Sequence, residues 1–334
     1  MIKTIYFRVD GDDGKFAGLG HIYRSLNFYT NLNKKLNKNH KFVFLSKYKE
    51  GIKILREKTN KKVIKFSRKN LNRLNFNKND VVIIDTLGAE KFLINKLNIN
   101  KIKKISFDEL NLKNFKSGIV INGILFTKKI LKKKKKIKIY QGTNYIVLNE
   151  NFSKKKFFID NKKINLKNIF ICSGGADHKD FLFKVSSYLL NFNNYKLNVV
   201  LGNAVKKTNK IFNLKHKKII KKINVNNVKK QMEKNDIIIC SGGTIMFEAI
   251  ATGFKPLVFE NYSHQKYAIK YFSKKNQIIN LGKLNIKNLK SLNDHIKKFN
   301  KSSLKENFKR NIKSIDGYGF SRINKILLKY INEK

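Results

Sequence analysis

Residues 5–36 read IYFRVDGDDGKFAGLGHIYRSLNFYTNLNKKL, and this stretch decides the fold. The apolar run Ile5–Val9 predicts a buried strand, and a segment with glycines at positions 11, 14, 18 and 20 follows it. Next comes a helical pattern whose apolar residues fall on one face. Those residues are Ile22, Leu26, Tyr29, Leu32 and Leu36. A strand, a glycine-rich turn and an amphipathic helix begin a doubly wound α/β sheet.

Short apolar runs alternate with helical patterns along the whole chain, as in parallel sheets that are buried on both faces. The strands predicted for the first half are Ile5–Val9, Phe42–Leu45, Val81–Ile84, Lys104–Phe107, Ile119–Ile121 and Tyr145–Leu148. Those of the second half are Ile169–Cys172, Leu197–Leu201, Ile237–Cys240, Leu257–Phe259 and Ile278–Asn280. A polar stretch rich in lysine and asparagine lies between the two series. We therefore expect two Rossmann-like domains, 1–152 and 166–334, joined by a linker at 153–165.

The net charge of +52 suggests at first a protein that binds nucleic acid. Only seven of the 74 basic residues are arginines, and the chain has one proline and no tryptophan. This is the bias of an A+T-rich genome, whereas nucleic-acid recognition favours arginine. We expect no nucleic-acid partner, but the lysine run 132–136 leaves weak association with an anionic membrane surface open. Whether the charge is functional or only codon bias stays open.

Two cysteines, Cys172 and Cys240, end apolar runs and are predicted to be buried strand residues. They are too few for a disulfide framework, and they lack the spacing of a zinc site. The N-terminus enters a strand at once, and no run reaches the roughly 18 apolar residues that span a bilayer. We expect a cytoplasmic monomer without a metal or cofactor.

His21 stands where the first strand gives way to the first helix. Gly18 and Gly20 before it let the backbone approach a ligand, although the third glycine of a dinucleotide motif is missing. In open α/β sheets this position faces the ligand crevice, and a helix N-terminus favours the neutral form of imidazole. His21 is therefore the candidate catalytic base.

Two further loops follow strands in the second half. Ser173-Gly174-Gly175 follows one, and Ser241-Gly242-Gly243-Thr244 follows another and opens a helix. Backbone N–H groups at such a helix start can bind an anion, here a phosphate. Glu248, one turn into that helix, could accept hydrogen bonds from a ribose diol. The polar loop that carries His264 and Gln265 follows the next strand and should face the same ligand.

Asp85 and Asp108 each follow an apolar strand directly. Acids at this edge of a sheet can serve a ligand or catalysis, but they also commonly cap the next helix. The sequence leaves open whether Asp10, Asp85 and Asp108 orient the base or support the fold.

Several of these motifs resemble one known family. Arg8-x-Asp10 with Gly18-x-Gly20-His21-x-x-Arg24 resembles the N-terminal motif of the UDP-2,4-diacetamido-2,4,6-trideoxy-β-L-altropyranose hydrolases of pseudaminic acid biosynthesis, which are related to spore-coat polysaccharide proteins. Asp85, Asp108-Glu109-Leu110, Tyr145-x-x-Leu148-x-Glu150-x-Phe152, the two glycine loops and Asp316-Gly317-x-Gly319-x-x-Arg322 match in the same order. The chain departs from the family at His264, where asparagine is common.

The resemblance implies a GT-B fold, with two Rossmann-like domains facing across a cleft and UDP held mainly by the second. It implies metal-independent hydrolysis of a UDP-linked amino or deoxy sugar, with His21 activating water and Glu248 holding the ribose. The substrate-binding residues it implies are Arg8, Asp10, Gly18, Gly20, Arg24, Asp85, Ser173, Gly174, Gly175, Ser241, Gly242, Gly243, Thr244, Glu248, His264 and Gln265.

Two alternatives remain. A GT-B glycosyltransferase would use an acceptor hydroxyl in place of water, and His21 could serve it equally well. A non-catalytic or nucleic-acid-binding protein with the same fold is a different class, and its affinity for nucleic acid, if it bound any, would fall steeply with salt. Neither the sugar nor the stereochemistry of the product follows from the sequence.

Overall fold

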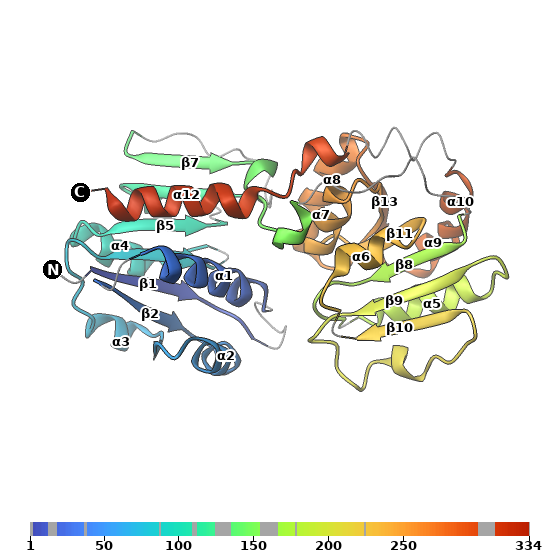
Figure 1. Ribbon diagram of the computed structural model, residues 1–334, viewed down its shortest axis with the longest axis horizontal. Coiled ribbons are helices and arrows are strands. Elements are labelled where there is room, and N and C mark those ends of the chain that lie inside the picture. Colours follow the sequence, from blue (N-terminus) through green and yellow to red (C-terminus); the bar gives the residue numbers. More distant parts are fainter. Residues whose placement is uncertain are drawn as a thin grey trace. The chain divides into compact units, whose positions relative to one another are not determined.

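The chain forms two parallel β-sheets, each flanked by helices (Figure 1). The computed structural model describes residues 3–12, 19–36, 39–86, 88–108, 112–123, 135–153, 166–177, 179–223, 225–299 and 311–333. The predicted fold class, two doubly wound Rossmann-like sheets, is confirmed.

The first sheet has seven strands in the order β3-β2-β1-β4-β5-β6-β7, and all of its pairs are parallel. Its strands are β1 (Lys3–Val9), β2 (His40–Ser46), β3 (Lys62–Lys65), β4 (Val81–Asp85), β5 (Lys103–Phe107), β6 (Gly118–Asn122) and β7 (Ile137–Gln141). Its helices are α1 (Gly20–Lys35), α2 (Lys49–Thr59), α3 (Arg68–Asn72) and α4 (Lys91–Ile99), with the short 3-10 turn η1 (Thr143–Tyr145).

Alternate strand residues of this sheet enter two separate cores. Ile5 and Phe7 of β1 pack on one face with α1, α2 and the C-terminal helix α12 (Gly319–Asn332). Tyr6, between them, joins the other core, which α4 covers. Burial on both faces explains why these strands are continuous apolar runs.

The second sheet has six strands in the order β10-β9-β8-β11-β12-β13, again parallel. Its strands are β8 (Asn168–Cys172), β9 (Lys196–Leu201), β10 (Ile219–Ile223), β11 (Ile237–Ser241), β12 (Leu257–Glu260) and β13 (Ile279–Lys283). Its helices are α5 (Phe181–Leu190), α6 (Val228–Glu233), α7 (Thr244–Ala251), α8 (Lys266–Lys274), α9 (Ile286–Lys290) and α10 (Leu292–Lys297), and its 3-10 turns are η2 (Glu150–Phe152), η3 (Lys210–Asn213) and η4 (Ser263–Gln265).

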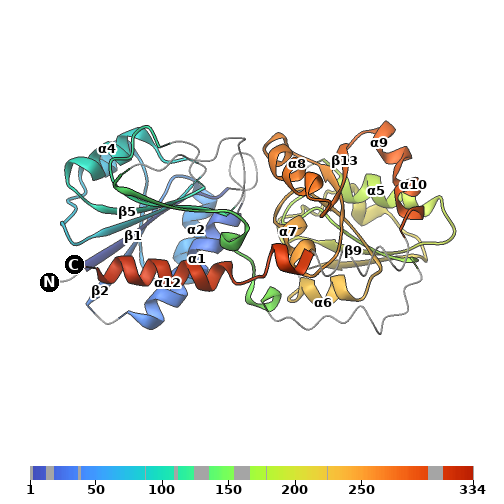
Figure 2. The ribbon, with the colours of Figure 1, turned by 90° about the horizontal axis from the view of Figure 1, so that it is seen from above.

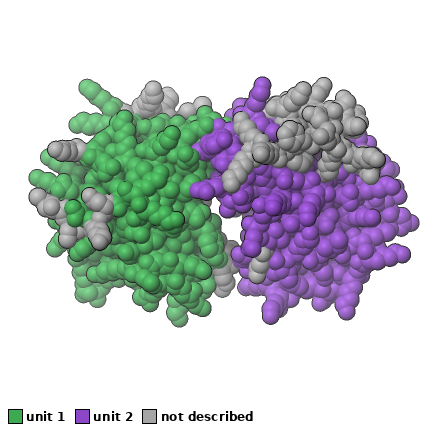
Figure 3. Space-filling model, in the orientation of Figure 1, with its two compact units in different colours: residues 1–147, 319–334 green, residues 148–318 purple. Residues whose placement is uncertain are grey.

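The chain divides into two compact units, residues 1–147 with 319–334 and residues 148–318 (Figure 3). This division differs from the expected one at the C-terminus, because α12 belongs to the first unit. Ile323, Leu327 and Ile331, four residues apart, enter the core of the first sheet, and α12 contacts α1 (Figure 2). Most of the predicted linker, 154–165, lies outside the described residues, and the predicted cleft stays a prediction.

Three edge strands were not predicted, and one predicted strand is wrong. Residues 145–148 form the end of η1 and an extended segment, not a strand. The edge strands β3, β7 and β10 were missed. Each of them contains lysines, as is usual for edge strands exposed to water. Their runs of apolar residues are therefore too short to indicate a strand. No helix in the described part of the chain is long and apolar enough to cross a bilayer.

Lys104 of β5 is buried in the first unit, and burial lowers the pKa of its ammonium group to about 8 from 10.5. The unfolded chain therefore holds this proton more tightly, so protonation opposes folding below pH 8 and this penalty fades between pH 8 and 10.5. We expect Lys104→Met to raise the free energy of unfolding by about 1–3 kcal/mol at pH 7.

Urea unfolding of Lys104→Met and the parent at pH 7 and pH 10 measures this difference. The advantage of the variant should shrink at the higher pH. Lys138→Met, at an exposed position of β7, is the control and should change stability little at either pH. An advantage that is equal at both pH values would contradict the assignment.

Candidate functional site

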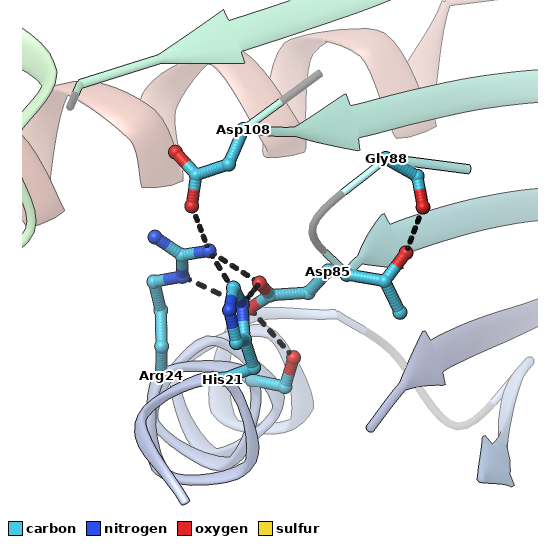
Figure 4. Close-up of polar contacts among 7 residues, drawn as sticks. His21, Arg24, Asp85, Gly88 and Asp108 are labelled. Carbon is cyan, nitrogen blue, oxygen red and sulfur yellow. Dashed lines mark hydrogen bonds and ion pairs between the residues drawn. The ribbon is translucent and has the colours of Figure 1, made fainter. Parts of the chain in front are cut away.

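The first unit gathers polar side chains at the carboxyl ends of β1, β4 and β5, which are neighbours in the sheet. His21 is the second residue of α1, Asp85 ends β4, and Asp108 directly follows β5. Figure 4 shows the side chains of His21, Arg24, Asp85 and Asp108 converging between α1 and the strand ends. Sequence positions far apart thus form one cluster at the edge where open α/β sheets bind ligands.

His21 and Asp85 form a hydrogen-bonded pair. His21 Nδ1 lies 2.7 Å from Asp85 Oδ1. The Asp85 side chain is 1% exposed, whereas that of His21 is 21% exposed. The buried carboxylate of Asp85 therefore holds one ring nitrogen of His21, while solvent can still reach the rest of the ring.

Arg24 holds Asp85 in place. Its Nε donates to Asp85 Oδ2 at 3.0 Å, and its Nη2 donates to Asp85 Oδ1. Ser25 Oγ also donates to Asp85 Oδ2, at 3.0 Å. Burial alone would raise the pKa of Asp85, but Arg24 and His21 together hold that pKa well below its usual range. Asp85 is thus a fixed carboxylate at any pH near neutral.

Asp108 is the second carboxylate on Arg24 and accepts from Nη2 at 2.6 Å. Burial opposes the guanidinium charge, yet Asp108 and Asp85 raise the pKa of Arg24 above its ordinary value. His21, Asp85 and Asp108 offer ligand atoms within 4.8 Å of one another, the spacing of a metal site. Arg24, bonded to both carboxylates, neutralises one of their two negative charges, which weakens the attraction for a divalent cation.

This geometry fixes the chemistry of His21. A carboxylate can only accept hydrogen bonds, so the proton of the neutral imidazole lies on Nδ1, where it is donated to Asp85. The lone pair is then on Nε2, which can take a proton from water or from a hydroxyl group. Asp85 does not cap α4, whose N-cap is Glu90, so the capping interpretation is wrong for this residue.

Arg8 and Asp10 pair with each other. Arg8 Nη1 and Nη2 donate to the two oxygens of Asp10 at 2.5 and 2.6 Å, and Nη2 also contacts Glu90. The Arg8 side chain is fully buried and stacks on Phe66, 3.9 Å from the ring centre. Asp10 in turn accepts from the backbone N–H of Lys47. The pair ties the end of β1 to the β2–α2 turn, which makes it a support for the glycine segment.

Of the two glycines before His21, Gly18 lies outside the described residues. A Cβ placed on Gly20 would meet no atom of the described residues within 4 Å.

In the second unit the first glycine loop joins β8 to α5. A Cβ on Gly174 or Gly175 would meet nothing within 4 Å, and Gly174 has a φ of 99°, which favours glycine. The backbone of Gly202 packs closely against this loop. A Cβ on Gly202 would lie only 2.2 Å from the carbonyl oxygen of Gly174. Ser173 Oγ donates to the Ala176 carbonyl. Gly202 therefore packs against the loop, while no described residue fills the space beside the Cα atoms of Gly174 and Gly175.

The second glycine loop joins β11 to α7 and is tied to the first, since Ser241 Oγ donates to the Ser173 carbonyl at 2.7 Å. A Cβ on Gly242 would lie 2.5 Å from Cδ1 of Ile269 of α8, so a larger residue there would force that side chain to shift. Gly243 is the N-cap residue of α7, and Thr244 is exposed at its first position. The backbone N–H groups at this helix start could hold an anion.

Glu248 of α7 has no hydrogen-bond partner among the described residues and lies beside Cys172 and Cys240. Burial raises the pKa of Glu248 to about 8. Both cysteines are buried and free, as predicted. A half-buried carboxyl without a partner costs free energy, and a ligand that supplies hydroxyl groups would remove that cost.

The loop after β12 lies against both glycine loops. Gln265 is buried, and its Oε1 accepts from the backbone N–H groups of Asn261 and Tyr262, while its Nε2 lies 3.6 Å from a Cβ built on Gly243. His264 is exposed and stacks on Tyr262, with ring centres 5.7 Å apart. Lys179 from the first loop donates to the Asn261 carbonyl at 2.6 Å.

The sequence did not place three of these residues in the site. Asp108 was recognised as a strand-end acid but not as a partner of Arg24. Ser25 lies one helical turn after His21, a spacing that could have indicated it. Lys179 follows the first glycine loop, and only the fold brings it to the β12 loop.

Two known proteins are similar to the chain in sequence. It is 33% identical over 273 residues to the uncharacterized protein MJ1062 of Methanocaldococcus jannaschii, covering 77% of this chain and 56% of that one. It is 27% identical over 294 residues to the spore coat polysaccharide biosynthesis protein SpsG of Bacillus subtilis, covering 81% of this chain and 82% of that one. The chain thus spans little more than half the length of the archaeal relative. No family model matches it.

Solved structures match nearly the whole chain. MurG of Acinetobacter baumannii superposes with a TM-score of 0.65 at 12% identity, over 98% of this chain and 100% of that one. The UDP-GlcNAc 2-epimerase of Neisseria meningitidis gives 0.56 at 13% identity, over 98% and 100%. At this identity the likeness concerns the fold alone, and the fold is GT-B.

Proposed function

We propose that the protein hydrolyses a UDP-linked sugar to UDP and the free sugar. The observation that carries the proposal is the His21–Asp85 pair, which leaves a basic nitrogen on a partly exposed imidazole at the ligand edge of a Rossmann-like sheet. SpsG, a relative over most of the chain, is named for polysaccharide biosynthesis, and the epimerase of the same fold was solved with UDP-GlcNAc. Both support a nucleotide sugar as the ligand.

In the proposed reaction His21 Nε2 takes a proton from water, and the resulting hydroxide attacks the anomeric carbon of the sugar. The bond from that carbon to the oxygen of the β-phosphate breaks, and its electron pair stays with UDP. The imidazolium, stabilised by Asp85, then returns its proton to solvent. Positioned base catalysis of this kind contributes about 10²–10⁴ in rate.

UDP is proposed to bind to the second unit. The N–H groups at the start of α7 and the open glycine loop would hold the diphosphate, whose charge increases as the bond breaks. Lys179 is a cation near that position. Glu248, which has no partner within the described chain, would accept the ribose hydroxyls.

The motifs that resemble the altropyranose hydrolases make UDP-2,4-diacetamido-2,4,6-trideoxy-altrose the first substrate to test, and pseudaminic acid biosynthesis the proposed context. The purified protein is incubated with this compound, or with UDP-GlcNAc, without an acceptor, and both products are followed by NMR. Release of UDP together with free sugar is expected. Release only after an acceptor is added would replace the hydrolase with a glycosyltransferase.

Glu248→Gln should weaken UDP binding at pH 9, where Glu248 is ionised, by about 10- to 100-fold, because the amide offers one neutral acceptor oxygen in place of the two charged ones that would bind the ribose diol. The substitution keeps the size of the side chain, so the glycine loops should stay in place. Calorimetric titration with UDP measures the effect. Glu260→Gln, at the end of β12, is the control and should bind UDP as the parent does. Unchanged affinity in Glu248→Gln would refute the ribose assignment.

A further inference from the structure

Arg24 Nη2 lies within hydrogen-bonding distance of three acceptor atoms but carries only two hydrogens. The three are Asp85 Oδ1, Asp108 Oδ2 at 2.6 Å and His21 Nδ1 at 3.1 Å. Carboxylates are stronger acceptors for a guanidinium than a neutral imidazole nitrogen. Both hydrogens therefore go to Asp85 and Asp108, and none remains for His21.

The contact with His21 matters because it decides which tautomer is present. If Nη2 donated to Nδ1, that nitrogen would have to be the acceptor, and the imidazole proton would move to Nε2. Nε2 would then be unable to take a proton from water. Removing the second acceptor of Nη2 frees a hydrogen on that nitrogen, which lies 3.1 Å from Nδ1.

Asp108 is held firmly enough to serve as that acceptor. Its side chain is 2% exposed, and its backbone N–H donates to the Ile121 carbonyl of β6 at 3.1 Å. Its φ of 51° is in the left-handed region, which is uncommon for non-glycine residues but which aspartate adopts more readily than most. Asp108 has this backbone conformation, and its carboxylate points toward Arg24 (Figure 4).

The net charge of the cluster also depends on Asp108 and favours proton uptake by His21. Asp85, Asp108 and Arg24 sum to one negative charge while His21 is neutral, and proton uptake by His21 brings the sum to zero. Without Asp108 the cluster would start neutral and become positive when His21 takes its proton, which disfavours that step.

We propose that Asp108 is a positioning residue for the base: by accepting the second hydrogen of Arg24 Nη2, it keeps His21 protonated on Nδ1 and leaves Nε2 free. The role of His21 rests on the proposed function, but its tautomer does not. Asp108 does not contact the substrate in this account and acts through Arg24.

The tautomer can be measured without turnover. In protein with ¹⁵N-labelled histidine at pH 8.5, long-range proton–nitrogen spectra separate Nδ1–H from Nε2–H imidazole, and the spectrum of His21→Gln identifies the signals of His21 among the six histidines. The parent should show Nδ1–H. Asp108→Ala should move His21 mainly to Nε2–H and lower kcat for UDP release about 10- to 100-fold, with KM within threefold. The exposed Asp294→Ala should change neither.

The double variant Arg24→Met/Asp108→Ala separates this role from a structural one. Because the competing donor is gone, His21 should return to Nδ1–H, bonded to Asp85. If Asp108→Ala does not fold, Asp108→Asn keeps the side-chain size but accepts more weakly, and it should give a mixture of the two tautomers. An unchanged Nδ1–H signal in the single variants, or a double variant that stays Nε2–H, would overturn the proposal. A parent with Nδ1–H but no UDP release would contradict the proposed function alone.

Discussion

His21→Ala should lower the rate of UDP release by about 10²–10⁴-fold, because the group that takes the proton from water is gone. UDP affinity should stay within a few fold, since the residues proposed to bind UDP belong to the second unit. The side chain is partly exposed at the start of α1, so its removal leaves no cavity in the core. Initial rates and UDP titrations on the same preparations measure both quantities.

His216→Ala is the control for this variant. His216 is an exposed histidine in the loop before β10, and its substitution should leave turnover unchanged. If His21→Ala kept more than about a tenth of the parent rate, a positioned base worth at least 10²-fold could not be His21.

Asp85→Asn should lower activity by a similar factor, about 10²–10⁴-fold, because it changes the tautomer of His21 while keeping the size of the side chain. The amide of asparagine can donate to Nδ1, which then becomes the acceptor and leaves the proton on Nε2. Arg24 would also lose a charged partner, and leaving a buried charge partly unpaired costs about 3–5 kcal/mol. Rates are measured below the unfolding midpoint of the variant, which a melting curve provides.

Arg24→Met/Asp85→Ala tests the tautomer separately. It removes the carboxylate together with the guanidinium that could donate to Nδ1, so no donor among the described residues remains beside Nδ1, and its activity should exceed that of Asp85→Asn. Equal activity in the two variants would show that Asp85 does not act through the tautomer of His21. Because Arg24 and His21 hold the pKa of Asp85 below its usual range, the stability from its charge persists at neutral pH and is lost as the pH falls below about 4.

The central strands could be predicted from the sequence, whereas three of the four edge strands could not. Strands such as β4 and β8 are buried on both faces and read as unbroken apolar runs. The missed strands β3, β7 and β10 all lie at sheet edges, where lysines replace apolar residues. The helix α12 has a clear apolar face, but nothing in its sequence shows that this face packs on the first sheet.

The candidate site shows the same limit. The position of His21 at the start of the first helix predicted that it would face a ligand, whereas the position of Asp85 at a strand end was also typical of a helix cap. The pattern could not show that Arg24 bridges Asp85 and Asp108, since that contact joins residues more than 60 positions apart. Nor could it show that Arg8 and Asp10 pair with each other, or that Gly242 packs closely against Ile269.

The measurement that tests the proposed hydrolysis most directly is turnover of the UDP-sugar in H₂¹⁸O without an acceptor. Water activated by His21 attacks the anomeric carbon, so the label should enter the free sugar and UDP should stay unlabelled. The sugar is sampled within minutes, before its anomeric oxygen exchanges with solvent, and His21→Ala runs alongside. Label in the β-phosphate of UDP would show that water attacks phosphorus, and it would contradict the account.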